Sequence, residues 1–268
     1  MPLFFAGQFN ELISISHVFI AFIAFSLSAS AVYILNDLQD IKADQLHPKK
    51  RFRPLASGAV TKNVAVGIMF ALLLFSVSLM YWLSETATAV LLGYVALNIA
   101  YSFSLKHISI LDITIIATGF VLRLFVGSTV TQTPLSMWIV IMTFLLALFM
   151  ALAKRRDDVL LYNDSGEKMR KAVDGYTVQL IDAAMMIMAS VVIVAYLLYT
   201  TSAEVVARLH SDYLYLTALF VILGVMRYLQ ITFVEMNSAS PTRVVLTDRF
   251  IQFTILGWLL AFVWLLYL

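Results

Sequence analysis

The sequence predicts an all-α integral membrane protein, and three observations carry this prediction. Of its 268 residues, 62% are hydrophobic and only 13% are charged, so little of the chain is suited to water. The apolar residues gather in runs of about twenty, the length that an α-helix needs to cross a bilayer. Basic residues concentrate in alternate loops, as they do in membrane proteins of fixed orientation. We therefore expect a single transmembrane helical domain over residues 1–268.

Hydropathy places eight spans along the chain, separated by short polar segments. Residues 1–11 form an apolar end that is too short to cross a bilayer, and they lack the basic start and cleavage site of a removable signal peptide. The expected spans lie at about 12–35, 63–83, 86–103, 110–129, 135–153, 181–200, 213–234 and 250–268.

The distribution of Lys and Arg predicts which side of the membrane each loop faces. Fifteen of the eighteen basic residues lie in four loops, at about 36–62, 104–110, 154–180 and 235–249. The opposite loops hold Arg208, while Arg123 and Arg227 lie inside spans. Because cytoplasmic loops carry the excess of Lys and Arg, we expect these four loops to face the cytoplasm of a bacterial cell, with the protein in its inner membrane.

Composition excludes several other classes of function. The formal net charge is only +2, which provides no general attraction for nucleic acid. The chain has no cysteine, so disulfides and thiolate metal sites are ruled out. Its four histidines are scattered without the pairing that a metal site needs.

The first polar cluster has the form N-D-x-x-D-x-x-x-D and consists of Asn36, Asp37, Asp40 and Asp44, here called the aspartate stripe. On a helix these side chains share one face. Like charges so close together repel each other, so the arrangement is costly unless a cation neutralises it. Oxygen-only ligands suit Mg²⁺, which takes one or two carboxylates and fills its other positions with water and substrate phosphates. The pattern predicts a catalytic magnesium site.

A basic run follows the stripe within one short loop. It contains Lys49, Lys50, Arg51 and Arg53, and side chains of this kind bind phosphate oxygens. A loop whose mixed charges only keep one face of a membrane protein soluble is the alternative, but solvation requires no fixed spacing. We favour a phosphate-binding loop beside the metal.

The second polar cluster runs from Tyr101 through Lys106 to Asp112, and Arg123 follows eleven residues later. Tyr101 and Lys106 fit two interpretations equally well, as membrane-interface anchors or as substrate-binding residues. Asp112 and Arg123 are harder to explain as anchors, because charges inside spans are expensive and usually face a polar cavity or a partner. Both can point inward from one face, since eleven residues make about three turns.

The third polar cluster begins with Lys154-Arg155-Arg156-Asp157-Asp158. A basic cytoplasmic loop that sets topology accounts for the later lysines and arginines of this segment. Asp157 and Asp158 directly follow a span end, a position suited to a second metal-binding carboxylate in a helical bundle, and we expect Asp158 to be a metal ligand. Near the end of the seventh span, Arg227 and Glu235 are expected to form a structural pair.

These motifs resemble the UbiA superfamily of membrane transferases, from about residue 3 to the last span. The stripe followed by His47-Pro48-x-Lys50-Arg51-x-Arg53-Pro54-x-Ala56-Ser57-Gly58 is most similar to the decaprenyl-phosphate phosphoribosyltransferase branch. Later segments are similar to the same branch: Tyr101-Ser102-x-x-Leu105-Lys106, Leu111-Asp112, Gly119-Phe120-x-x-Arg123 and Ala153-Lys154-Arg155. Two features depart from the family. The chain begins without the usual basic, Trp-containing segment, and Asp157-Asp158 stands where the prenyl-diphosphate branches have D-x-x-x-D.

The resemblance implies a UbiA-like bundle of the eight expected helices, with residues 1–11 as an N-terminal remnant of a ninth. Enzymes of that branch use Mg²⁺ at a cytoplasm-facing cavity to move a 5-phosphoribosyl group from phosphoribosyl pyrophosphate onto a polyprenyl phosphate, releasing pyrophosphate. A homo-oligomer is compatible with such a bundle. The matching motifs imply substrate-binding roles for Lys50, Arg51, Arg53, Tyr101, Lys106, Asp112, Arg123, Lys154 and Arg155.

Two other functions stay open. An aromatic prenyltransferase of the ubiquinone or menaquinone type shares the first motif but takes a polyprenyl diphosphate as donor. The irregular second carboxylate motif, Asp157-Asp158, and the basic run that follows the stripe both disfavour an aromatic prenyltransferase. A transporter or lipid-binding membrane protein accounts for the apolar spans and inward charges, but not for a stripe suited to metal next to a basic run suited to phosphate.

Overall fold

The structure is a computed structural model, and it describes residues 12–46, 50–165, 171–209, 211–236 and 241–267. The regular elements among these residues are all helices, with no strand, which confirms the all-α class. Seven helices are long and apolar enough to cross a membrane. An eighth apolar helix, Arg249–Leu265, is shorter, so the expected count of eight spans is not confirmed. The N-terminal remnant at 1–11 and Lys49 lie outside the described residues.

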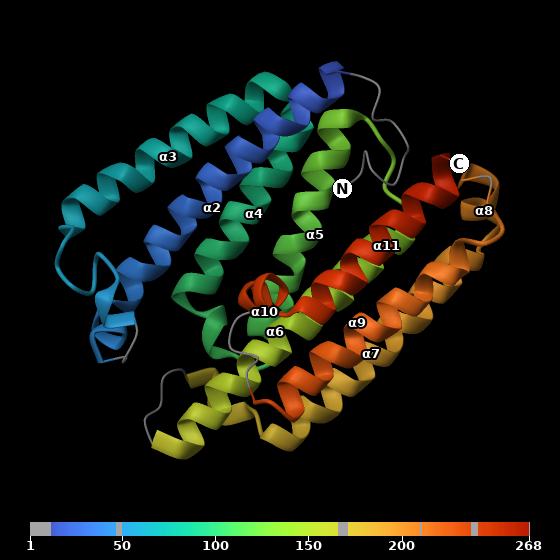
Figure 1. Ribbon diagram of the computed structural model, residues 1–268. Helices are drawn as coiled ribbons and strands as arrows, with labels where there is room; N and C mark the ends of the chain where they lie inside the picture. Colours follow the sequence, from blue (N-terminus) through green and yellow to red (C-terminus); the bar gives the residue numbers. More distant parts are fainter. Residues whose placement is uncertain (1–11, 47–49, 166–170, 210, 237–240, 268) are drawn as a thin grey trace. The chain divides into compact units, whose positions relative to one another are not determined.

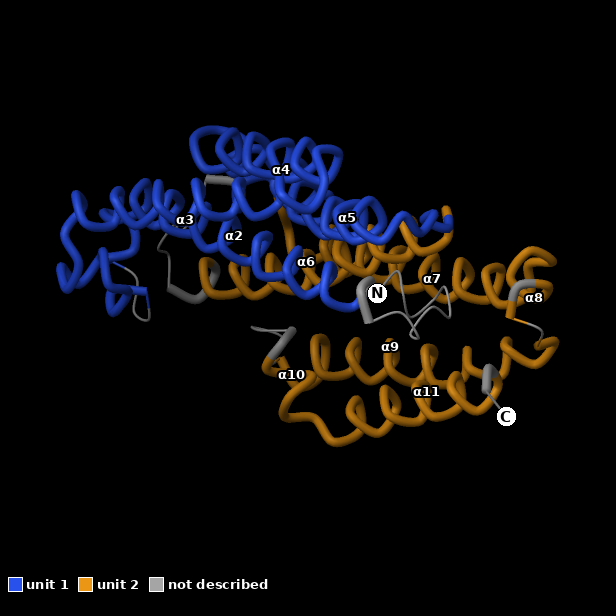
Figure 2. Tube along the Cα trace, turned by 90° about the horizontal axis from the view of Figure 1, so that it is seen from above, with its two compact units in different colours: residues 1–136, 168–175 blue, residues 137–167, 176–268 orange. Residues whose placement is uncertain are grey.

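The chain divides into two compact units, which Figure 2 draws in different colours. Unit 1 comprises Met1–Ser136 with Lys168–Gly175, and unit 2 comprises Met137–Glu167 with Tyr176–Leu268. Each unit is described by itself below.

The described residues of unit 1 form four long helices and three short 3-10 helices. The long helices are α2 (Leu12–Leu46), α3 (Lys62–Leu83), α4 (Glu85–Phe103) and α5 (Leu111–Thr131), and the short ones are η1 (Lys50–Phe52), η2 (Leu105–His107) and η3 (Lys171–Gly175). Helix α2 packs against α3, α4 and α5 (Figure 1).

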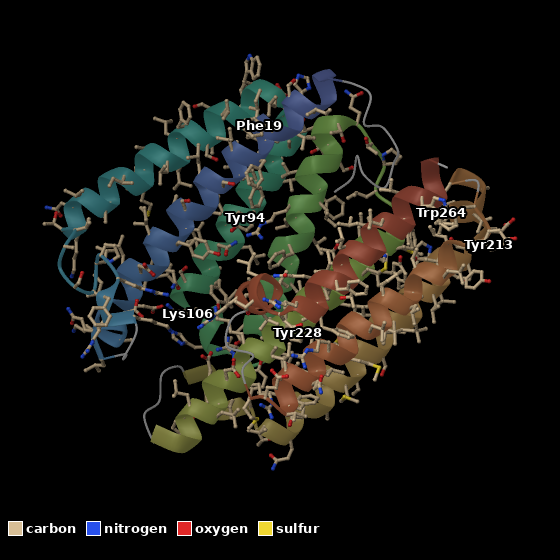
Figure 3. The ribbon with its side chains drawn as sticks, viewed as in Figure 1. Phe19, Tyr94, Lys106, Tyr213, Tyr228 and Trp264 are labelled. Carbon is tan, nitrogen blue, oxygen red and sulfur yellow. The ribbon has the colours of Figure 1, made fainter. Side chains whose placement is uncertain are left out.

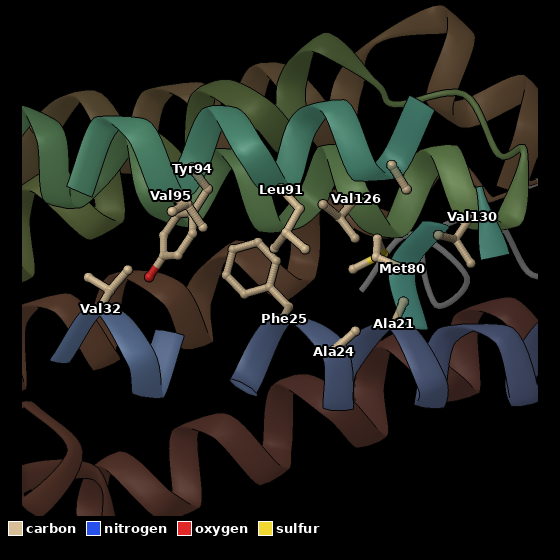
Figure 4. Close-up of a cluster of buried hydrophobic side chains, with 11 residues drawn as sticks. Ala21, Ala24, Phe25, Val32, Met80, Leu91, Tyr94, Val95, Val126 and Val130 are labelled. Atoms are coloured by element: carbon tan, nitrogen blue, oxygen red, sulfur yellow. The ribbon is translucent and has the colours of Figure 1, made fainter. Parts of the chain in front are cut away.

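Small and aromatic side chains hold α2 against its neighbours in unit 1. Ala24 is fully buried, and the Phe25 and Tyr94 ring centroids lie 4.5 Å apart (Figure 4). A hydrogen bond of 2.7 Å joins the hydroxyls of Ser28 and Ser76, which links α2 to α3. Small residues let the helix backbones approach closely, and the paired serines satisfy their polar groups away from water.

Helix α2 continues past the expected end of the first span at 35. It runs to Leu46 because its sequence contains no Gly or Pro, and Pro48 then disfavours a helical conformation in the residue before it. The aspartate stripe therefore lies on a helix, as its spacing predicts. Residues 36–46, expected as the first part of the loop at 36–62, are therefore helical.

Unit 2 consists of α6 (Met137–Ser165), α7 (Val178–Thr201), α8 (Ala203–Leu209), η4 (Leu214–Thr217), α9 (Ala218–Phe233), α10 (Pro241–Thr247) and α11 (Arg249–Tyr267). Helix α6 packs along α7, and α9 packs along α11. Helix α6 extends beyond the expected span end at 153, so the third polar cluster starts on a helix and not in the loop expected at 154–180.

Helix α11 packs in unit 2 through a close contact at a glycine and a hydrogen bond from a tryptophan. A Cβ atom at Gly257 would lie 2.5 Å from the Phe220 ring, so a larger residue there would force α9 and α11 apart. Trp258 Nε1 donates to the Tyr196 hydroxyl at 2.6 Å, and that hydroxyl is 2.7 Å from Thr217 Oγ1. A cavity of about 190 Å³ between α9 and α11 has no charged lining residue, so we do not take it as the reactive site.

Candidate functional site

The aspartate stripe occupies the last turns of α2 in unit 1. Asn36, Asp40 and Asp44 recur every fourth residue and leave the helix on one face. Asp44 is buried, and the side chains of Asp37 and Asp40 are 27% and 26% exposed. Because the carboxylates are shielded from bulk water, repulsion among them is stronger than it would be at an open surface.

One nitrogen of Arg53 is shared by two carboxylates of the stripe. Arg53 Nη1 donates to Asp37 Oδ1 at 2.7 Å and to Asp44 Oδ2 at 2.8 Å. The guanidinium thus sits between two acidic residues that are seven positions apart on α2. Such charge-assisted contacts are about twice as strong as neutral hydrogen bonds.

The loop after η1 is folded so that Arg53 faces the helix. Gln45 Nε2 donates to the carbonyl of Ala56 at 3.2 Å, which ties the loop to the end of α2. Ala56 is buried, and Gly58 follows with φ +79°, a left-handed conformation that L side chains rarely adopt. The Ala56-Ser57-Gly58 sequence therefore supports a tight turn that holds the basic loop in place.

Lys106 neutralises the third carboxylate from a different element. Its Nζ donates to Asp40 Oδ1 at 2.6 Å and to Asn36 Oδ1 at 3.3 Å, and the Asn36 amide donates to Asp40 Oδ2 at 3.1 Å. Lys106 lies on η2 and is buried, with 7% exposure (Figure 3). A buried lysine at this position requires its acidic partner, because an unpaired buried charge is strongly unfavourable.

The donor chemistry of the stripe fits a hard divalent cation. No cluster of three or more His, Cys, Asp or Glu in a metal-binding arrangement is found within the described parts of the chain. One oxygen each of Asp37 and Asp44 lies within 2.8 Å of Arg53 Nη1, so the two carboxylates converge on one positively charged group. Carboxylate and amide oxygens are the ligands that Mg²⁺ uses.

Of the other expected site residues of unit 1, one interacts with the aspartate stripe. Lys50 interacts electrostatically with Asp37. Arg51 is exposed, with its guanidinium 4.8 Å from the Phe52 ring centroid. Tyr101 is half-buried on the last turn of α4. Asp112 is fully buried in the first turn of α5, where the helix dipole stabilises a negative charge.

Arg123 lies deeper in unit 1, among aromatic rings. Its guanidinium carbon is 4.6 Å from the ring centroid of Phe120, 5.5 Å from that of Phe25 and 6.0 Å from that of Tyr94. A charge inside a span is expected to face a polar cavity or a partner, and Arg123 lies among three rings, one of which, Tyr94, also interacts with it through its hydroxyl. Nothing in the sequence identifies Phe25 and Tyr94 as its partners, since each is one of many aromatic residues in apolar spans.

In unit 2, the third polar cluster is internally paired. Arg155 Nη1 contacts Asp158 Oδ2 at 2.5 Å, and both lie on α6. Arg156 Nε donates to Asp182 Oδ1 at 2.7 Å, and Arg156 Nη1 donates to the Thr232 carbonyl at 3.0 Å. Arg156 therefore ties α6 to α7 and α9. The metal-binding role of Asp158 and the substrate-binding roles of Lys154 and Arg155 stay predictions.

A family model described as the UbiA prenyltransferase family matches residues 3–254 of the chain. The decaprenyl-phosphate phosphoribosyltransferase of Mycolicibacterium smegmatis is 32% identical over 251 residues, which cover 90% of this chain and 78% of that protein. The enzyme of the same name from Corynebacterium glutamicum is 31% identical over 257 residues, covering 95% of this chain and 77% of that protein.

Solved structures agree on the fold. A UbiA homolog from Archaeoglobus fulgidus bound to DMAPP and Mg²⁺ matches with a TM-score of 0.71 at 16% identity, covering 98% of this chain and 92% of that one. The same homolog bound to Cd²⁺ matches with a TM-score of 0.69 at 17% identity and the same coverage.

Proposed function

The chain belongs to the UbiA prenyltransferase family of membrane transferases, and we propose that it moves a 5-phosphoribosyl group from phosphoribosyl pyrophosphate onto a polyprenyl phosphate. The observation that carries this choice of substrates is the 32% identity to a phosphoribosyltransferase over 90% of the chain. The neighbouring carboxylates and basic residues of unit 1 support this choice of donor. A pyrophosphate group bound with a metal ion needs carboxylates for the ion and basic residues for its phosphate oxygens.

Mg²⁺ is the proposed cofactor, held by oxygens of Asp37, Asp40 and Asp44 with the Asn36 amide. When bound, it supplies positive charge that stabilises the departing pyrophosphate. The solved homologs of A. fulgidus that hold Mg²⁺ or Cd²⁺ are in keeping with a divalent ion in this fold.

The basic residues of unit 1 are proposed to change partners when the donor binds. Arg53 and Lys106 contact the three carboxylates of the stripe. If those carboxylates held Mg²⁺, both side chains would be available for the phosphate oxygens of the donor. Lys50 and Arg51 lie in or beside the same short η1 segment and add further positive charge for the donor's phosphates.

The proposed reaction needs no general base. A lipid phosphate oxygen, already ionised at neutral pH, attacks the anomeric carbon of the ribose. The bond from that carbon to the pyrophosphate oxygen breaks, and the pyrophosphate leaves with the electron pair. This agrees with a stripe that contains carboxylates and an amide but no histidine.

We further propose that the protein lies in a bacterial inner membrane with this site toward the cytoplasm. The excess of Lys and Arg on the loop that follows α2 supports this orientation. The soluble donor would then reach the site from the cytoplasm, and the lipid acceptor and product would stay in the membrane.

Substitution of the stripe tests the proposed function. Asp40→Asn or Asp44→Asn should lower turnover by about 100-fold or more, the scale for losing one oriented charge-stabilising contact. The measurement is transfer of radiolabel from phosphoribosyl pyrophosphate to a polyprenyl phosphate by the purified protein in the presence of Mg²⁺.

Asp212→Asn is the matched control, since Asp212 is an exposed carboxylate outside the stripe and its substitution should leave turnover unchanged. Full turnover in either stripe variant would contradict the assignment. A parallel assay with a polyprenyl diphosphate and an aromatic acceptor identifies the donor class directly.

A further inference from the structure

Arg123 is a membrane-embedded cation without an acidic partner among the described residues. It lies in α5, within the candidate span Leu111–Thr131. Four arginines of the described residues each form an ion pair with a carboxylate: Arg53, Arg155, Arg156 and Arg227. Charged residues inside a membrane span are expensive and usually serve a function, so the solitary charge of Arg123 calls for a ligand.

Aromatic side chains from three helices shape the surroundings of Arg123. Phe25 comes from α2, Tyr94 from α4 and Phe120 from α5, and all three ring centroids lie within 6.0 Å of the guanidinium carbon. Arg123 itself is half-buried, so part of its guanidinium stays accessible. Cation–π contacts and a side-chain interaction with the Tyr94 hydroxyl steady the side chain, and the remaining N–H donors of the guanidinium can serve another acceptor.

The position of this aromatic cage along α2 separates it from the aspartate stripe. Figure 4 shows Tyr94 reaching from α4 toward α2, between Phe25 and Val32. Phe25 precedes Asn36 by eleven residues, so this ring of the cage lies roughly 16 Å from Asn36 along the helix axis. It is therefore on the membrane side of the stripe.

We propose that Arg123 and its aromatic cage form the binding site for the phosphate group of the lipid acceptor. This inference rests on the proposed function. In a displacement at the anomeric carbon, the nucleophile approaches from the face opposite to the leaving group. If the donor's pyrophosphate is held at the stripe, the acceptor phosphate must lie on the other side of the ribose, deeper in the membrane.

The chemistry of the cage suits the head of an isoprenyl phosphate. The planar guanidinium fork matches two phosphate oxygens at once. Phe120 offers apolar surface to the first isoprene units of the chain, whereas Phe25 is buried behind the guanidinium. Because Phe120 is 44% exposed, the cage has an apolar edge along which a tail can lie.

The test compares two ligands that differ only in the head group, farnesyl phosphate and farnesol, on the purified full chain without donor. Dissociation constants are measured by native mass spectrometry. The wild-type protein should bind the phosphate roughly 10- to 100-fold more tightly than the alcohol, the scale for charge-assisted hydrogen bonds. Arg123→Met should bring this ratio close to one while leaving the affinity for farnesol unchanged.

Arg123→Lys keeps the charge but loses the fork, so it should give an intermediate ratio. If Arg123→Met does not fold, the inference is tested by the phosphate-to-alcohol affinity ratios of the wild-type protein and of Arg123→Lys. Arg249→Met removes an exposed arginine elsewhere and should keep the wild-type ratio. A wild-type protein without preference for the phosphate, or an Arg123→Met variant that keeps the preference, would overturn the inference. A phosphate preference that depends on Arg123, in a protein unable to transfer phosphoribose, would support this site and refute the proposed function.

Discussion

Arg53 and Lys106 show how much of a site can be inferred from residue type alone. The sequence places Arg53 in a basic run beside the aspartate stripe and Lys106 in a separate polar cluster, and the structure brings both to the stripe. There Arg53 contacts Asp37 and Asp44, and Lys106 contacts Asp40. Their roles in binding phosphate stay predictions. The pairing depends on how the loop after α2 folds back. That is set by Gln45, Ala56 and Gly58 and not by the spacing of the charges.

Competition between Arg53 and a metal ion leads to a prediction at this scale. Arg53→Gln removes the cation shared by Asp37 and Asp44, so the variant should bind a divalent ion about tenfold more tightly in the absence of donor. The same change should weaken binding of phosphoribosyl pyrophosphate, because the phosphates lose a basic partner. Titration with Mn²⁺, followed by electron paramagnetic resonance, measures the first effect.

Lys62→Gln is the control for overall charge in the Mn²⁺ titration. Lys62 is an exposed residue at the start of α3, and removing its charge should leave Mn²⁺ affinity unchanged. A variant at Arg53 that binds Mn²⁺ no better than the wild-type protein would show that the guanidinium and the metal do not compete.

Among the elements, the ends of α9 and α11 are joined by a cluster around Arg227. The expected pair with Glu235 is confirmed at 2.7 Å. Asp248, just before α11, also contacts Arg227 at 2.7 Å and accepts from the Ile251 backbone N–H at 2.9 Å. Asp248 was not predicted as a partner, because 21 residues and the short helix α10 separate it from Arg227.

Asp248 gives this cluster a pH dependence. The hydrogen bond from Arg227 lowers the pKa of Asp248 below its ordinary value of 3.8, so the ionised carboxylate stabilises the folded state. This contribution is complete above pH 3.8 and disappears as the pH falls through the lower pKa of the folded protein.

Asp248→Asn should therefore lower the free energy of unfolding by about 1 kcal/mol near neutral pH, the difference between a charged and a neutral hydrogen bond. The gap in Tm between wild type and variant should narrow below pH 3.8. Thermal unfolding in detergent across this range measures it, with Asp212→Asn as the exposed control. A gap that stays constant in acid would mean that the Asp248 charge contributes nothing.

Helix boundaries were harder to predict than helix identity. Hydropathy ended the first and fifth spans at 35 and 153, where the first charged or polar residues appear, but α2 and α6 continue to Leu46 and Ser165. A helix that leaves the bilayer needs no apolar residues. The spacing of the aspartate stripe was the better guide, because it already implied that the helix continues to Asp44.

For the whole molecule, the all-helical class and the family followed from apolar run lengths and the first motif. The number of spans did not, because the apolar part of α11 is shorter than the other spans. Contacts between residues far apart in sequence were also beyond prediction. Arg123 and Phe25, for example, belong to the different helices α5 and α2, and no spacing within either helix specifies that the two side chains meet.

The absence of cysteine makes the orientation in the membrane directly measurable. Ser57 lies in the loop expected to face the cytoplasm, and Asp212 lies in a loop expected on the opposite side. Both residues are exposed. In intact bacterial cells, a membrane-impermeant maleimide should label the Asp212→Cys variant, and should label the Ser57→Cys variant only after the membrane is opened.

The unmodified chain provides the background for this experiment, because it has no thiol to react. Equal labelling of both variants in intact cells would place the two loops on the same side. That result would contradict both the alternation of loops and the cytoplasmic site.

Carboxylates crowded along one helical face would normally drive each other apart once their bound ion departs. At the end of α2 this repulsion is offset, because Arg53 and Lys106 act as counterions from two separate segments of the chain. We therefore expect the last turns of the helix to keep their shape whether or not the proposed Mg²⁺ is bound.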